Sequence, residues 1–131
     1  MIVRRYAQIL GIAFIVIFLL ELRTSEDAFG VLNSDHAEDF LHLLTGVTMT
    51  YAGFWAAPRL RDKIVVAQVL FYLVLGSVAY ADPEVLGLFL HDLGTVDNVI
   101  HLLQGGLSLV AVYSFGVLFG PAPPQEQPAA A

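Results

Sequence analysis

Two nine-residue stretches, EDFLHLLTG at residues 38–46 and DNVIHLLQG at residues 97–105, are variants of one motif, and the second follows the first by 59 positions. Both contain an acidic residue, Asp or Asn, two apolar residues, a histidine, a Leu-Leu pair, a polar residue and a glycine, in this order. A motif repeated at such a distance predicts that the chain consists of two similar halves.

Around each motif the sequence contains two long apolar segments, so the chain has four. They run from about residues 6–22, 40–57, 64–81 and 99–120, and each is close to the roughly 17–25 residues that a helix needs to cross a bilayer core of about 30 Å. Within lipid each segment satisfies its own backbone hydrogen bonds, which favours helices. We therefore predict one all-α domain over residues 1–120, an integral membrane four-helix bundle built from two parallel two-helix repeats.

The repeat also predicts how the helices are arranged. Two helices in each half insert both halves in the same direction, so a pseudo-two-fold axis along the membrane normal is expected to relate them. Because the motif opens the second helix of each half, we expect the fourth helix to pack against the second near this axis.

Composition supports a membrane protein and excludes several other classes. The chain is 57% apolar and only 14% charged, with a mean hydropathy of +0.73, whereas soluble domains are about 45–50% apolar and about 25% charged. It contains no Cys, which excludes disulfides and thiolate metal ligands. A net charge of −6 argues against a nucleic-acid partner.

The charged residues predict the orientation in the membrane. Five of the six basic residues fall on one side of the four expected spans, and most acidic residues fall on the other side; the five are Arg4, Arg5, Arg59, Arg61 and Lys63. The positive-inside rule then predicts a multi-pass protein of the inner (plasma) membrane with both termini in the cytoplasm. Residues 121–131 are rich in Pro, Ala and Gln and are expected to be a disordered cytoplasmic tail.

The second motif resembles a known family. Leu86-Gly87-Leu88-Phe89, followed by Asn98-x-x-His101-x-x-x-Gly105, is similar to the hallmark of an uncharacterised family of small four-span bacterial membrane proteins. The first half departs from this pattern, because Asp39 stands in the position of Asn98. The resemblance implies a four-helix membrane fold, and it implies no reaction.

The motif histidines are candidate ligands for a metal or a cofactor. Glu38 with His42, and Asp97 with His101, are spaced four residues apart, so each acid shares a helix face with its histidine. Brought together by the repeat, these four residues form a set suited to zinc or iron. His42 and His101 alone could instead hold a haem or a chlorin as axial ligands.

The alternative for the same histidines is helix packing, and this is the role that we expect, with no cofactor. A histidine near the start of a span can hydrogen-bond a neighbouring helix, and a glycine one turn later lets that helix approach. Gly46 and Gly105 lie four residues after His42 and His101. Gly116 and Gly120 have the Gly-x-x-x-Gly spacing found at membrane helix contacts.

These features lead to three hypotheses of function. We expect a structural or accessory role in a membrane complex or homo-oligomer, with the lipid bilayer as the surrounding partner, because we find no catalytic set of residues. The first alternative is a metal-, haem- or chlorin-binding membrane protein that uses His42 and His101. The second alternative is a small transporter or channel.

Overall fold

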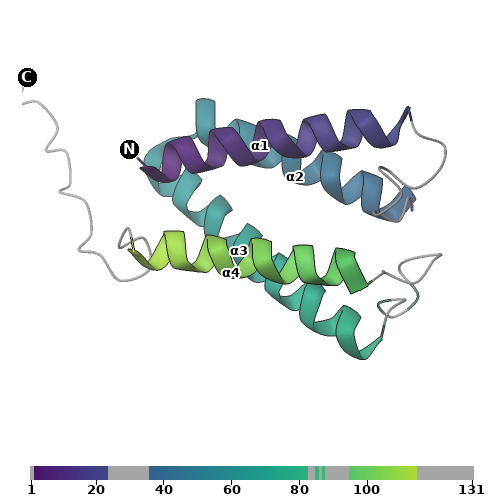
Figure 1. Cartoon of the computed structure of the whole chain (residues 1–131). Coiled ribbons are helices and arrows are strands. Elements are labelled where there is room, and N and C mark those ends of the chain that lie inside the picture. Colours follow the sequence, from purple (N-terminus) through teal and green to yellow (C-terminus); the bar gives the residue numbers. More distant parts are fainter. Residues whose placement is uncertain (1, 24–35, 83–84, 86, 88–94, 115–131) are drawn as a thin grey trace, which may run out of the picture.

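The structure is a computed structural model that describes residues 2–23, 36–82, 85, 87 and 95–114. These residues form four α-helices and no strand (Figure 1): α1 (Ile2–Glu21), α2 (His36–Phe54), α3 (Pro58–Ala81) and α4 (Thr95–Ser114). The predicted all-helical fold is therefore confirmed for this part of the chain. The predicted tail, residues 121–131, and the end of the fourth predicted span lie outside the described residues.

Each helix begins before the apolar segment from which it was predicted. The helix α3 begins at Pro58, where the missing N–H and the fixed φ of proline suit the first turn, and it includes the basic residues before residue 64. The helix α2 begins at His36 and carries Glu38 and Asp39 in its first turn. Acidic side chains at this position interact favourably with the positive end of the helix dipole. Hydropathy marks the apolar part of a helix, whereas the helix itself continues into polar sequence.

Two of these helices pass a simple test for membrane spans. The stretches Val3–Glu21 in α1 and Pro58–Ala81 in α3 are long and apolar enough to cross a membrane, and Asn98–Val110 in α4 is a shorter apolar stretch.

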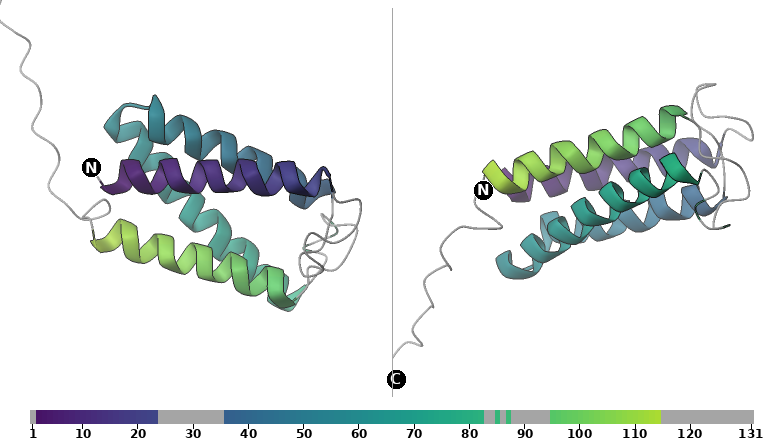
Figure 2. Two further views of the ribbon diagram at one scale, coloured as in Figure 1. Left: turned by 45° about the horizontal axis from the view of Figure 1, so that its top comes forward. Right: turned by 90° about the horizontal axis from the view of Figure 1, so that it is seen from below.

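The helices form two hairpins, α1 with α2 and α3 with α4, which are joined mainly by packing of α2 against α3. Figures 1 and 2 show that α1 and α3 run in one direction and that α2 and α4 run in the opposite direction. The expectation that the fourth helix packs against the second is wrong: α4 packs closely against α3, and α2 packs closely against α1 and α3. Among the described residues, α2 and α4 have little backbone contact.

Glycines explain why each helix stays with its own hairpin partner. A Cβ atom at Gly46 would lie 2.9 Å from the backbone nitrogen of Ile15 in α1, and a Cβ atom at Gly105 would lie 2.9 Å from the backbone nitrogen of Leu73 in α3. Real Cβ atoms essentially never come this close to another atom. The two motif glycines therefore permit contact between helix backbones within each hairpin, which draws α2 towards α1 and α4 towards α3.

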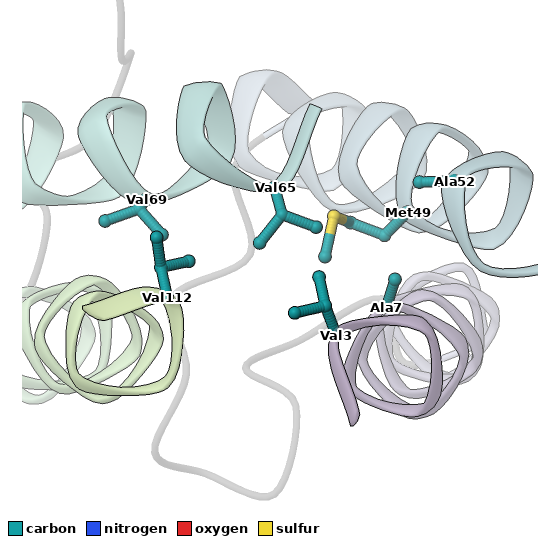
Figure 3. Close-up of a cluster of buried hydrophobic side chains, with 7 residues drawn as sticks. All are labelled: Val3, Ala7, Met49, Ala52, Val65, Val69 and Val112. Carbon is teal, nitrogen blue, oxygen red and sulfur yellow. The ribbon is translucent and has the colours of Figure 1, made fainter. Parts of the chain in front are cut away.

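The hydrophobic core joins the two hairpins. Figure 3 shows one cluster to which all four helices contribute, formed by Val3, Ala7, Met49, Ala52, Val65, Val69 and Val112. A second cluster consists of Phe14, Tyr72, Leu75 and Ala79. Most core side chains are small or medium in size, which is consistent with closely spaced helices.

Many outward-facing side chains of the four helices are large and apolar. Ile9 is 70% exposed, Leu107 is 68% exposed and Val110 is 62% exposed. Similar side chains cover the outside of α2 and α3, among them Val47, Leu70 and Val74. In water such a surface would be an extensive exposed apolar patch, which folded soluble proteins avoid.

Candidate metal centre

Four ionisable side chains are buried together where α1 ends and where α2 and α4 begin. Glu21 is 4% exposed, Glu38 3%, His42 7% and His101 4%. Glu21 is the last residue of α1, Glu38 and His42 lie in the first two turns of α2, and His101 lies in the second turn of α4. Figure 1 shows that these three helix ends lie at the same end of the molecule. Glutamate is almost never fully buried without a partner.

Glu21 holds the ring of His42. His42 Nδ1 lies 2.9 Å from both carboxylate oxygens of Glu21. A carboxylate only accepts hydrogen bonds, so Nδ1 carries a proton and donates it. In the neutral ring the other nitrogen, Nε2, then has a free lone pair, which is the form that binds a metal. The same carboxylate–histidine arrangement supports histidine ligands in many metal sites.

Glu38 and His101 meet across α2 and α4. His101 Nε2 lies 3.7 Å from Glu38 Oε1, which is longer than a hydrogen bond. Two ligands of one tetrahedral zinc ion are about 3.3 Å apart, because each Zn–N or Zn–O bond is about 2.0–2.1 Å long. His101 Nδ1 forms no hydrogen bond with any described residue. The pair therefore resembles two ligands of one ion more than a hydrogen-bonded pair.

The three potential ligands form a compact group. One ligand atom each from Glu38, His42 and His101 lies within 4.8 Å of the other two, and all three residues are buried. Two histidines and one carboxylate are a donor set that occurs at catalytic zinc sites, where a fourth position remains for water or substrate, and at non-haem iron sites.

Two aromatic rings enclose the histidines. Phe14 of α1 packs against His42, and Tyr72 of α3 packs against His101, with ring centroids 5.3 Å apart in each pair. The two aromatic rings also pack against each other at 5.7 Å. Each histidine is thus covered by an aromatic residue from the first helix of its own half. This apolar cover keeps water away from the ligand atoms and strengthens electrostatic interactions between them.

The structure brings some of the predicted site residues together and leaves others undescribed. Glu38, His42 and His101 lie together, and Gly46 and Gly105 lie against neighbouring helices. Asp97 is part of α4, but its side chain is outside the described part of the chain, and Gly116 and Gly120 are outside it altogether. Asn98 is buried, and its Nδ2 donates a hydrogen bond of 3.3 Å to the carbonyl oxygen of Ala79 in α3.

Two residues of the site, Glu21 and Tyr72, were not predicted from the sequence. Glu21 belongs to neither copy of the motif, although it ends α1 at the end of the bundle where α2 begins. Tyr72 follows Phe14 by 58 positions, close to the repeat distance of the motif. Aligning the first helix of each half would have placed both aromatic residues beside the motif histidines.

Comparisons of the chain with known protein families, with curated proteins and with solved structures find no match. The resemblance to a family of four-span bacterial membrane proteins therefore stays a prediction, and the function is argued from the site alone.

Proposed function

We propose that the chain is a four-span integral membrane protein that binds one divalent transition-metal ion with Glu38, His42 and His101. The observation that carries this proposal is the buried group of three ligand atoms within 4.8 Å of one another. Ionisable residues inside membrane helices are costly and usually serve a function.

The outer surface and the distribution of charge support the membrane part of the proposal. Large apolar side chains face outward on all four helices. Arg4, Arg5, Arg59 and Lys63 lie at the end of the bundle where α1 and α3 begin, opposite to the candidate metal centre. By the positive-inside rule this basic end faces the cytoplasm, so the metal centre lies near the outer face of the membrane.

The balance of charge favours a divalent ion. Glu21 and Glu38 place two buried carboxylates beside the two histidines, and carboxylate and imidazole groups are ligands of divalent transition metals. A divalent cation with two neutral imidazole ligands supplies two positive charges. Imidazole suits zinc, iron, copper and nickel, and the carboxylate of Glu38 makes zinc or ferrous iron the best match.

The position of Glu38 favours a single ion over a haem or chlorin. An axially bound tetrapyrrole lies flat between its two histidines and fills the space between their rings. In this structure a carboxylate oxygen of Glu38 lies within 4.8 Å of ligand atoms of both His42 and His101. A carboxylate this close to both histidines suits the third ligand of a single ion, whereas a tetrapyrrole held by two axial histidines needs no third protein ligand.

The test is metal binding by the full chain in detergent. After treatment with a chelator, the protein is titrated with Zn²⁺, and the bound metal is measured by elemental analysis. We expect one ion per chain. Replacing a ligand, as in His42→Ala, His101→Ala or Glu38→Gln, is expected to weaken binding by more than the 10–100-fold that loss of an outer-shell partner costs.

Asn98→Ala is the matched control, because Asn98 is also buried in the first turns of α4 and also bonds across helices. It should bind Zn²⁺ like the native chain. If the native chain binds no more Zn²⁺ than the ligand variants, the metal proposal is wrong. The buried cluster then has a packing role, as in the structural or accessory protein expected from the sequence.

A further inference from the structure

A cavity of about 420 Å³ lies between α2 and α3, apart from the candidate metal centre. Its walls are apolar and include Leu41, Leu44, Ile64 and Phe71. Binding pockets for small molecules are typically about 300–1,000 Å³, with apolar walls and a few polar groups. The cavity is partly open along the side of the bundle, so in a membrane its opening faces lipid.

One edge of the cavity is polar and carries Thr45, Thr48 and Gln68. Gln68 Nε2 donates a hydrogen bond of 3.0 Å to Thr45 Oγ1, and Thr45 Oγ1 is also 3.0 Å from the hydroxyl oxygen of Tyr72. The Thr48 hydroxyl donates to the carbonyl of Leu44 in its own helix. A glutamine amide has two N–H donors and an acceptor oxygen, so Gln68 keeps one donor and one acceptor for a ligand.

The position of Gln68 along α3 limits the kind of ligand. Gln68 is four residues after Ile64, where the apolar part of α3 begins, which places it about 6 Å along the axis and inside the hydrocarbon on the cytoplasmic side. Phospholipid headgroups lie at the membrane surface, not at this depth. None of the described residues that line the cavity is charged. The ligand is therefore a neutral lipophile whose polar group lies just inside the hydrocarbon, below the headgroups.

We propose that this cavity binds a membrane quinone, an activity beyond the proposed metal site. A carbonyl oxygen of the quinone accepts the free N–H of Gln68, and the hydroxyl of the corresponding quinol donates to the Gln68 oxygen. One amide thus suits both redox forms. The half-exposed ring of Phe71 offers an aromatic wall for the flat headgroup, and the open side lets an isoprenoid tail continue into lipid.

A short chain of contacts links the cavity to the candidate metal centre. The hydrogen bonds from Gln68 through Thr45 end at the hydroxyl of Tyr72, and the Tyr72 ring packs against His101. A quinone bound at Gln68 therefore lies three hydrogen bonds from Tyr72, the residue that contacts a candidate ligand. The binding of quinone itself needs no metal, so the two proposals are tested separately.

The experiment measures binding of decylubiquinone to the purified full chain in detergent by native mass spectrometry, without added metal. We expect one saturable decylubiquinone per chain. Gln68→Leu removes the amide at similar size and is expected to weaken binding about tenfold, because a hydrogen bond left unmade costs this much. Ala67→Phe fills the cavity and is expected to abolish binding.

Val74→Phe is the matched control, since Val74 is an exposed residue of α3 outside the cavity, and it should bind like the native chain. Circular dichroism checks the fold of all variants. Absence of saturable binding to the native chain overturns the proposal. The proposal is also overturned if Gln68→Leu and Ala67→Phe both bind decylubiquinone as tightly as the native chain does. Complete displacement of decylubiquinone by an equimolar amount of the neutral lipid dioctanoylglycerol would overturn it as well.

Discussion

Removing the carboxylate of Glu21 should weaken metal binding even though Glu21 is not a proposed ligand. Both of its oxygens lie 2.9 Å from His42 Nδ1, so Glu21 fixes the ring orientation and the tautomer that presents Nε2. Loss of such an outer-shell partner typically weakens metal binding by about 10–100-fold. Glu21→Ala is therefore expected to raise the Kd for Zn²⁺ by about this factor. Glu21→Gln retains an acceptor oxygen and should have a smaller effect.

The same loss appears in the stability of the protein. With free Zn²⁺ at 100 times the native Kd, binding stabilises the native chain by about 2.7 kcal/mol. A variant that binds 100-fold more weakly gains only about 0.4 kcal/mol at the same concentration. Without metal, Glu21→Ala is also expected to lose about 1–3 kcal/mol, because His42 Nδ1 is left without a buried partner.

The assay compares thermal unfolding in detergent with and without Zn²⁺, together with direct titration. The control is Asp62→Asn, which removes another carboxylate at the opposite end of the bundle, where Asp62 pairs with Arg61. The control should leave the Zn²⁺-dependent gain unchanged. If Glu21→Ala lowers stability equally with and without Zn²⁺ and leaves the Kd unchanged, Glu21 does not orient a ligand and the reasoning is refuted.

Three further predictions concern packing and topology. In chemical unfolding, Gly105→Ala should destabilise the chain by about 1–3 kcal/mol through overpacking, because its Cβ would meet the backbone of Leu73. Gly106→Ala is the control and should be neutral or stabilising, because its Cβ would meet nothing within 4 Å. A larger loss for Gly106→Ala than for Gly105→Ala would contradict the packing of α4 against α3. Tyr72→Phe should lower stability by about 0.6 kcal/mol, the average for hydrogen bonds between membrane helices, and keep Zn²⁺ binding, because the ring contact with His101 remains; loss of Zn²⁺ binding would show that the hydroxyl itself supports the site. Ala57→Cys introduces a single cysteine, since the chain has none, in the connection between α2 and α3, and an impermeant thiol reagent should label it only after the cells are opened. Labelling of intact cells would reverse the proposed orientation.

The sequence was sufficient to predict the helices but not to predict which helices pack against each other. Hydropathy indicated where the helices lie, because the length of an apolar segment is a local property of the sequence. The contact expected between the second and fourth helices is wrong because the repeated motif does not reveal what each glycine faces. Gly46 and Gly105 lie against the first helix of their own hairpins, and this local packing determines the arrangement.

The candidate site was predictable only in part, because some of its contacts follow from local spacing and others from the packing of helices. Glu38 and His42 share a helix face through their spacing, and the repeat indicated His101 as their counterpart. Glu21 belongs to no motif, and its contact with His42 depends on how α1 is rotated about its axis relative to α2. Such a rotation is set by packing along the whole hairpin, including the close contact at Gly46, and no short sequence pattern specifies it.

The most direct test of the central claim is the zinc K-edge X-ray absorption spectrum of the full chain loaded with one equivalent of Zn²⁺. The proposed site predicts a first shell of nitrogen and oxygen at about 2.0–2.1 Å, with the outer-shell scattering of two imidazole rings. His101→Ala should reduce this scattering to one ring, and Asn98→Ala should leave it unchanged. A native spectrum without imidazole scattering, typical of zinc bound by water and surface carboxylates, would contradict the account.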